Sequence, residues 1–264
     1  MASSKVVFIT GANYGIGYET AKAFYQDPKP YHVLVGARSP KKGEAAIQRL
    51  QQECPEAKNT LELVLVDLES DESIEKAYEH IQASPGRLDW LINNAGVSHD
   101  PDWTRGKMSL RDCFTKAYDV NVTGTHIVTC TLMPLLLKSS DPRLIFVAGL
   151  SQVTQAAEKY FPTPAQPAGW PKKVDFETIG YRCSKTALTM LMLDWNHKLQ
   201  ADGVKVWSVG PGFLRTGLGN MEDSPIAKLA GHPSIGANVI KSVAEGERDV
   251  DVGKIVGKDG LIPI

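Results

Sequence analysis

The sequence of 264 residues has few cysteines, no long apolar run and no large excess of either charge. Its cysteines lie far apart, which leaves neither a CxxC redox motif nor the paired spacing of a zinc site: Cys54, Cys113, Cys130 and Cys183. The six histidines are scattered as well, so we predict no bound metal. Widely spaced cysteines fit a reducing compartment, and we expect a cytoplasmic protein.

Apolar runs and charge narrow the class of protein further. No stretch approaches the roughly 20 apolar residues of a membrane helix, and the run Val6–Ile9 is too short for the core of a signal peptide. We therefore expect a soluble protein with no membrane partner. The 29 basic and 30 acidic residues include no block that would neutralise a nucleic-acid backbone, so nucleic acid is not an expected partner.

Short runs rich in β-branched residues alternate with longer amphipathic segments along the chain. The predicted strands span residues 6–10, 32–35, 61–66, 90–92, 144–147 and 204–209, with a weaker one at 254–256. Alternation of strands and helices indicates βαβ units and a parallel sheet, and nearly continuous apolar strands indicate helices on both faces. We predict one α/β domain over residues 1–264, with a doubly wound parallel sheet of about seven strands.

Two segments interrupt this rhythm. Residues 151–180 are rich in proline and aromatics, and residues 213–233 mix glycine with apolar side chains. We predict that the first borders a substrate and that the second is a movable flap. Five of their side chains suggest an apolar wall for a bulky substrate, although such loop residues could equally anchor the loop to the body: Phe161, Trp170, Phe213, Leu214 and Met221.

The first predicted strand runs into a glycine-rich turn, Thr10-Gly-Ala-Asn-Tyr-Gly-Ile-Gly17, which opens a helical pattern. Glycines let the backbone approach a pyrophosphate, and the N–H groups and dipole of the helix attract its charge. Three glycines could also simply permit tight packing. We predict that the turn binds a dinucleotide through Gly11, Asn13, Tyr14, Gly15, Ile16 and Gly17.

The second predicted strand ends at Arg38, where an NAD site usually carries an acidic residue. An arginine can form charge-assisted bonds with a 2′-phosphate, so the cofactor expected is NADP(H). Lys41 and Lys42 follow at once, and they could equally be the solvated start of a surface helix.

Two more strand ends are candidate cofactor contacts. Asp67 and Leu68 follow the third strand, where an Asp can accept a hydrogen bond from an adenine amino group. Asn94, Ala95 and Gly96 follow the fourth and could keep the backbone near the cofactor. Asp67 could also merely cap the next helix, and the second group could be an ordinary turn.

Tyr181 and Lys185 are the candidate acid/base pair. Residues at i and i+4 share a helix face, so the ammonium can favour the ionised phenol and bring its pKa of about 10 toward neutrality. Tyr25 and Lys29 have the same spacing, and we assign them no chemistry. The helix of Tyr181 follows the fifth strand, which places its phenol near the carboxyl edge of the sheet.

Taken together, these motifs resemble those of the classical short-chain dehydrogenase/reductase family, and to some extent those of its monomeric carbonyl reductases. Residues 10–17 are similar to the family's TGxxxGxG, 93–96 to its NNAG and 181–185 to its YxxxK. Asn121 matches its active-site asparagine, and Pro211, Gly212 and Thr216 match the segment that holds the nicotinamide carboxamide. The resemblance spans nearly the whole chain and implies a Rossmann fold.

The resemblance also implies a reaction with a small-molecule substrate. A hydride would pass from NADPH to a ketone or an aldehyde, or back from an alcohol, while Tyr181 gives the proton. Lys185 would hold the nicotinamide ribose, and Asn121 would anchor a water. The long interval from Ser151 to Tyr181 is similar to that of the monomeric reductases, so a monomer is favoured slightly over a homo-oligomer.

One departure from the family concerns its catalytic serine, which normally ends the fifth strand. Ala148 or Gly149 stands there, and Ser151 is the first hydroxyl available. If the loop bends back, Ser151 can polarise the substrate oxygen; otherwise it is only a loop hydroxyl. This departure keeps two alternatives open: a catalytically quiet NADP(H)-binding module, and an enzyme of the same family that acts on an imine or another non-carbonyl group.

Overall fold

The computed structural model describes residues 4–149, 151–160, 163, 165–172, 176–220 and 228–264. Their strands form one sheet in the order β3-β2-β1-β4-β5-β6-β7-β8. In chain order these are β1 (Lys5–Ile9), β2 (Tyr31–Ala37), β3 (Thr60–Leu65), β4 (Trp90–Asn93), β5 (Arg143–Val147), β6 (Lys205–Gly210), β7 (Ile255–Gly257) and β8 (Gly260–Ile262). The predicted doubly wound Rossmann fold is thereby confirmed.

The sheet differs from the prediction at its last edge. The strand β8 pairs antiparallel with β7, whereas the other neighbouring strands run parallel. Only Lys258 and Asp259 separate the two strands, so they form a tight hairpin. A strand of three residues is too short to produce a recognisable alternation of apolar side chains, which is why β8 was not predicted.

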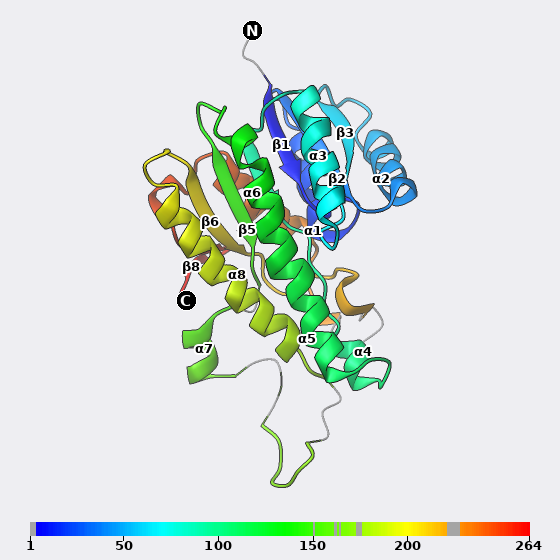
Figure 1. Cartoon of the computed structure of the whole chain (residues 1–264), viewed down its shortest axis with the longest axis vertical. Coiled ribbons are helices and arrows are strands. Elements are labelled where there is room, and N and C mark those ends of the chain that lie inside the picture. The colour runs from blue at the N-terminus through cyan, green and yellow to red at the C-terminus, as the bar shows by residue number, and fades with distance from the viewer. Residues whose placement is uncertain (1–3, 150, 161–162, 164, 173–175, 221–227) are drawn as a thin grey trace.

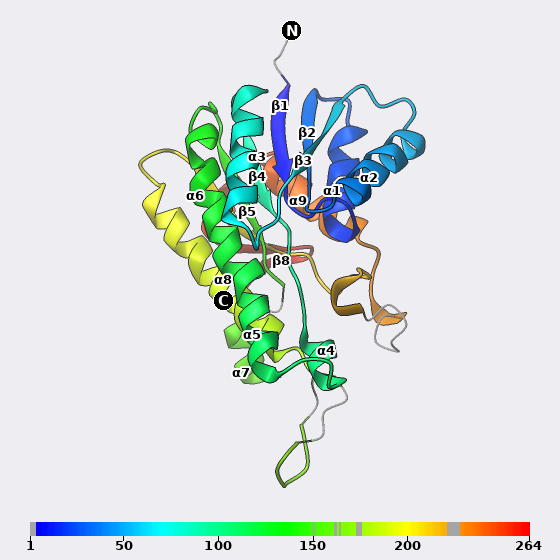
Figure 2. The ribbon, with the colours of Figure 1, turned by 45° about the vertical axis from the view of Figure 1, so that its right-hand side comes forward.

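Helices cover both faces of the sheet (Figures 1 and 2). On one face lie α3 (Asp71–Ala83), α6 (Thr125–Leu136) and α8 (Ile179–Lys198). On the other lie α1 (Gly15–Tyr25), α2 (Pro40–Glu53) and α9 (Ser234–Ala244). Further helical segments are α4 (Asp100–Thr104), α5 (Leu110–Tyr118), the π-helical η1 (Asp119–Gly124), α7 (Val153–Glu158), η2 (Leu218–Asn220) and η4 (Asp249–Asp251).

The strand β1 shows why the apolar runs are continuous. Successive side chains of a strand point to opposite faces. Val6 and Phe8 therefore enter the core beneath α3, α6 and α8, while Val7 and Ile9 enter the core beneath α1, α2 and α9. Because both faces are covered, neither set can be polar.

The chain reverses its direction of growth between β1 and β4, which are neighbours in the sheet. In doubly wound sheets a crevice opens at this switch point, beyond the carboxyl ends of the strands. The glycine-rich turn follows β1 and the turn at 94–96 follows β4, so the fold brings both predicted cofactor motifs to the same crevice.

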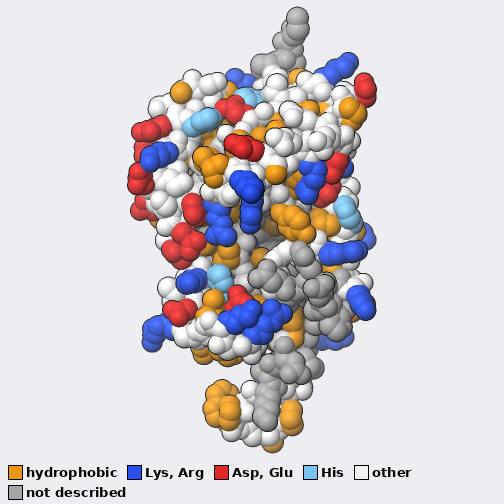
Figure 3. Space-filling view, turned by 90° about the vertical axis from the view of Figure 1, so that its right-hand side faces the viewer, with side chains coloured by type: hydrophobic (Ala, Val, Ile, Leu, Met, Phe, Trp, Pro, Cys, Tyr) orange, Lys and Arg blue, Asp and Glu red, His pale blue; other side chains and the backbone are white. Residues whose placement is uncertain are grey.

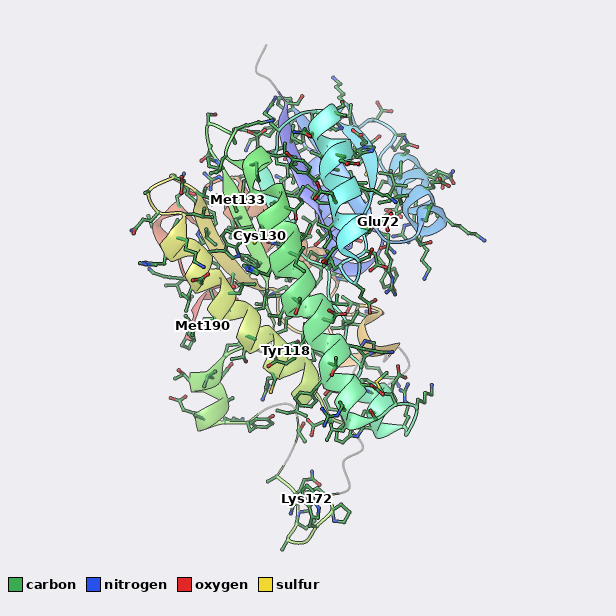
Figure 4. The ribbon with its side chains drawn as sticks, viewed as in Figure 1. Glu72, Tyr118, Cys130, Met133, Lys172 and Met190 are labelled. Atoms are coloured by element: carbon green, nitrogen blue, oxygen red, sulfur yellow. The ribbon has the colours of Figure 1, made fainter. Side chains whose placement is uncertain are left out.

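The predicted loop 151–180 is partly ordered into α7. Residues 165–172, which include Lys172, extend away from the body of the molecule (Figures 1 and 4). Trp170 is 88% exposed, so it is not part of a pocket wall, contrary to the prediction. Of the four other side chains proposed for that wall, Phe213 and Leu214 line the cavity described below, whereas Phe161 and Met221 lie outside the described residues.

The outer surface carries a few apolar side chains. Tyr118, Cys130 and Met190 are exposed on α5, α6 and α8 (Figure 4). The preference for a monomer stays a prediction. Within the described ranges, no helix combines the length and the apolar character that crossing a membrane requires.

Candidate active site

A cavity of about 580 Å³ opens at the carboxyl ends of the strands around the switch point. Nearly all of the predicted cofactor residues line it, together with Tyr181 and Lys185: Gly11, Asn13, Tyr14, Gly15, Ile16, Arg38, Asp67, Leu68, Asn94, Ala95, Gly96, Pro211, Gly212 and Thr216. Segments more than 200 residues apart in sequence, such as those of Gly11 and Thr216, thus meet at one site, as the motifs predicted.

The glycine-rich turn has the conformation that a phosphate-binding turn needs. Gly11 and Gly15 have φ values of 65° and 59°, in the left-handed region that favours glycine. The N-cap residue, Tyr14, makes no side-chain capping hydrogen bond, and Gly15 and Ile16 at the start of α1 line the cavity, where their end of the helix can attract an anion. Gly17 does not line the cavity: a Cβ there would lie 2.5 Å from the Gly11 carbonyl oxygen, so this glycine serves packing.

Thr10 connects the two cofactor turns by hydrogen bonds, and this contact was not predicted. Its hydroxyl oxygen accepts hydrogen bonds from the backbone N–H groups of Asn94 at 3.1 Å and Ala95 at 3.0 Å. The Asn94 side chain in turn donates to the Thr10 carbonyl at 2.9 Å. The turns after β1 and β4 therefore hold each other in place.

Basic side chains lie at the far end of the cavity, where β2 ends. Arg38 lines it, and so do Ser39 and Lys42 from the start of α2. Arg38 is 3.6 Å from Glu69 and largely exposed, so its guanidinium is accessible to a phosphate. Over the face drawn in Figure 3, basic and acidic side chains are otherwise interspersed rather than gathered into a stripe.

Tyr181 and Lys185 stand on the first turns of α8 as the i,i+4 spacing predicted. Lys185 is 2% exposed, and its Nζ donates to the Val147 carbonyl oxygen at 2.9 Å. The same Nζ lies 5.7 Å from the centroid of the Tyr181 ring. The two groups are therefore close, at the end of β5.

Burial controls the protonation of this pair. It raises the pKa of the Tyr181 phenol well above its ordinary value, and it lowers the pKa of the Lys185 ammonium to about 8. The predicted pull of Lys185 toward an ionised phenol is thus outweighed by desolvation. At neutral pH Tyr181 holds its proton, which suits a general acid.

Asn121 lies beside the cavity without lining it. Asn121 lies in the π-helical segment η1 and is fully buried, and its side-chain amide forms three hydrogen bonds. Its Oδ1 accepts from the Val97 N–H at 2.8 Å, and its Nδ2 donates to the Val97 carbonyl at 2.9 Å and to the Ser184 hydroxyl at 2.9 Å. Asn121 therefore joins the segment after β4 to α8.

Ser151 does not share the described cavity lining with Tyr181. Its side chain is buried, its hydroxyl donates to the Ala148 carbonyl at 3.4 Å, and the described lining of the cavity does not include it. Gly149 lines the cavity instead, and a Cβ built on it would lie 3.9 Å from the Tyr181 hydroxyl oxygen. The position that faces the phenol thus has no side chain.

Other lining residues escaped the sequence motifs. They come from four places along the chain: Val97, Ser98, Gln152, Gln155, Phe176, Thr178, Leu218, Ala230 and Ile262. Those in the loop 151–180 were indicated only by the length and the composition of that loop, and Ile262 belongs to the unpredicted β8. In the part of the chain that the structure describes, no group of three His, Cys, Asp or Glu residues could hold a metal ion.

A family model described as "short chain dehydrogenase" matches residues 5–160. The chain belongs to the short-chain dehydrogenase family. As a member it is an oxidoreductase, and its cofactor is a nicotinamide dinucleotide.

Known proteins agree with this assignment over the whole chain. The short-chain dehydrogenase/reductase tropE of Talaromyces stipitatus is 46% identical over 99% of this chain and 98% of its own length. The short-chain dehydrogenase/reductase eupG of a Phoma species is 42% identical, over 92% and 91%. The crystal structure of an NADPH-bound carbonyl reductase from chicken fatty liver has the same fold, with a TM-score of 0.79, 20% identity and full coverage of both chains.

Proposed function

We propose that this short-chain dehydrogenase is an NADPH-dependent reductase of ketones or aldehydes. One observation carries the proposal: the Tyr181 phenol, which burial keeps protonated, lies with the buried ammonium of Lys185 at the cavity. A phenol that holds its proton is suited to give it to a carbonyl oxygen as negative charge develops there. Reduction is therefore the favoured direction.

The dinucleotide fits the cavity by the chemistry of its lining. The left-handed glycines at 11 and 15 and the start of α1 would hold its pyrophosphate, and Pro211, Gly212 and Thr216 would hold the nicotinamide end. When bound, the nicotinamide supplies the hydride.

The protein's own residues handle the proton. Tyr181 donates it to the substrate oxygen, and the nearby charge of Lys185 stabilises the phenolate that remains. Lys185 is held by the Val147 carbonyl, so its ammonium stays beside the ring. General acid catalysis of this kind contributes on the order of 10²–10⁴-fold to the rate.

The preference for NADPH rests on Arg38. It lies at the cavity with Lys42, and no acidic residue follows β2 directly. A guanidinium can bind a 2′-phosphate through two parallel hydrogen bonds. Apolar lining residues favour a bulky, largely apolar substrate: Val97, Phe176, Phe213, Leu218 and Ile262.

The test follows the oxidation of NADPH and of NADH with a panel of aldehydes and ketones of increasing size. We expect turnover with bulky carbonyls and a preference for NADPH of at least about tenfold. Arg38→Ala should remove that preference, whereas Lys41→Ala, a neighbouring cation outside the described cavity lining, should not.

Tight NADPH binding without turnover of any carbonyl would contradict the proposal. The bare position at Gly149 would then favour the quiet NADP(H)-binding module or reduction of an imine. An imine panel under the same conditions separates these two alternatives.

A further inference from the structure

The start of α8, which carries Tyr181, is capped from far away in the sequence. Thr178 occupies the N-cap position, and its side chain makes no capping hydrogen bond. Instead, the Asp100 carboxylate, 80 residues upstream, accepts from the Gly180 N–H at 2.7 Å and from the Tyr181 N–H at 2.9 Å. The Glu177 carboxylate accepts from the Thr178 and Ile179 N–H groups. Every free N–H at this end of α8 is therefore satisfied.

Asp100 is an unusual cap because it is a fully buried charge. It forms no salt bridge with any residue that the structure describes, so its charge is compensated by the two N–H groups, by the Ser98 hydroxyl and by the dipole of a helix of 20 residues. A serine suffices to cap α5, where Ser109 accepts from the Asp112 N–H. A buried carboxylate costs far more in desolvation than a hydroxyl. The extra bond to the backbone of Tyr181 is what the carboxylate adds.

The sequence of α8 makes room for this contact. A Cβ at Gly180 would lie 3.2 Å from Asp100 Oδ1 and 3.1 Å from Cys113 Sγ, so a larger residue would press against both. Burial, with the charge of Asp100 adding to it, raises the pKa of the Cys113 thiol to about 11. The thiol thus stays neutral beside the carboxylate.

Asp100 does not line the cavity itself but lies two residues from Ser98, which does. It ends the segment 97–100, whose first residue, Val97, is held by the Asn121 amide. The Ser98 hydroxyl donates to Asp100 Oδ2 at 3.3 Å. Because Val97 and Ser98 line the cavity, one short segment connects the cavity wall to the backbone of Tyr181.

We propose that Asp100 is a positioning residue, which fixes the Tyr181 phenol relative to the cavity wall formed by Val97 and Ser98. This inference rests on the proposed reductase function, because its consequence is the placing of the proton donor. A misplacement of about 1 Å can cost on the order of 100-fold in rate.

The experiment compares Asp100→Ala, Asp100→Asn and Ser109→Ala with the wild type. For each variant, kcat, KM, the Kd of NADPH and hydrogen exchange of the backbone amides over residues 178–184 are measured. Asp100→Asn retains one acceptor oxygen and tests the inference if the alanine variant fails to fold. Ser109→Ala removes the cap of α5, a neighbouring helix, without touching Tyr181.

We expect Asp100→Ala to lower kcat by about 10- to 100-fold with the Kd of NADPH unchanged. Asp100→Asn should fall between it and the wild type, and the Gly180 and Tyr181 amides should exchange faster in both. Ser109→Ala should leave kcat and these amides unchanged.

Two results would overturn the inference: unchanged exchange in Asp100→Ala, or faster exchange with wild-type kcat. If the wild type reduces no carbonyl, the proposed function fails on its own. The exchange of the Gly180 and Tyr181 amides then decides whether Asp100 holds the start of α8.

Discussion

Basic side chains have opposite environments at the two ends of the strands. At the amino ends of β5 and β6, Arg143 and Lys205 both bind Asp141 and Asp249. At the carboxyl end of β5, Lys185 is held by a carbonyl oxygen and forms no salt bridge within the described part of the chain. Charges at one end are paired, and a charge at the other is left available.

The pKa values follow the same division. At the amino ends, burial acts to raise the pKa of Glu245, but hydrogen bonds from Tyr31, Lys29 and Lys241 hold it at about 2. At the carboxyl ends, burial alone shifts Tyr181 and Lys185 toward their neutral forms. At the amino ends, charged and hydrogen-bonding partners stabilise the ionised side chains. At the carboxyl ends, burial without a charged partner among the described residues shifts the pKa values of Tyr181 and Lys185, as is typical of catalytic groups.

Exchanging a lysine at each end for methionine is the sharpest way to break this comparison. Lys185→Met should lower kcat by about 10²–10⁴-fold and leave the melting temperature unchanged or raised, because it removes a buried charge that no carboxylate of the described residues pairs. Lys205→Met should leave kcat unchanged and cost about 1 kcal/mol of stability, since its ion pairs are about a third exposed. Steady-state kinetics and thermal unfolding of both variants check this, and equal kinetic losses would contradict it.

A substitution of Arg143 tests the ion pairs at the amino ends of the strands alone. Its guanidinium is nearly buried and binds two carboxylates and the Val243 carbonyl. Arg143→Met should lower the free energy of unfolding by roughly 3 kcal/mol, at the low end for a broken buried ion pair, because the carboxylates can turn toward solvent. Urea unfolding measures this loss. A fall in kcat of the folded variant would show that the two ends are not independent.

The pH dependence of the reaction tests the carboxyl end. The pKa of Lys185 is lowered to about 8, so its positive charge is present below that pH and lost above it. The rate of reduction should be flat below about pH 7 and fall by roughly tenfold per pH unit above pH 8. Lys185→Arg keeps the charge and should move the fall to higher pH. A profile that stays flat to pH 10 would contradict the role of this ammonium.

The smallest expected changes in kcat concern the position beside the Tyr181 phenol, where Gly149 provides no hydroxyl. Ser151→Ala should leave kcat unchanged, because the Ser151 hydroxyl bonds to Ala148 and Ser151 is not part of the described cavity lining. Gly149→Ser should raise kcat several-fold, since it adds a donor beside the phenol in a space that a Cβ can occupy. The kcat of each variant, measured with one carbonyl substrate, tests these two expectations. A loss of about 100-fold in Ser151→Ala would show that the loop moves to bring this serine in.

Much of the fold could be predicted because local sequence patterns indicate its strands. The seven predicted strands are apolar runs bounded by turns, and burial on both faces requires that pattern. The strand β8 was missed because three residues carry too little periodicity. Trp170 was misplaced because an aromatic side chain in a loop has no local signal that says which way the loop runs.

The site could be predicted where position in the fold fixes it. The turns after β1 and β4 and the i,i+4 pair on α8 had to meet at the carboxyl edge. Contacts between distant side chains could not be foreseen: Thr10 with the turn after β4, and Asp100 with the start of α8. The pKa of Tyr181 was misjudged because spacing reveals the neighbouring charge and not the burial that outweighs it.

The most direct test of the account is Tyr181→Phe, which removes one oxygen atom from the carboxyl end. We measure carbonyl reduction by NADPH, the Kd of NADPH and the melting temperature of this variant beside the wild type. The account predicts a fall in kcat of at least about 100-fold with the Kd and the melting temperature unchanged. A variant that reduces the same carbonyl at the wild-type rate would contradict it, because Tyr181 would then not be the proton donor.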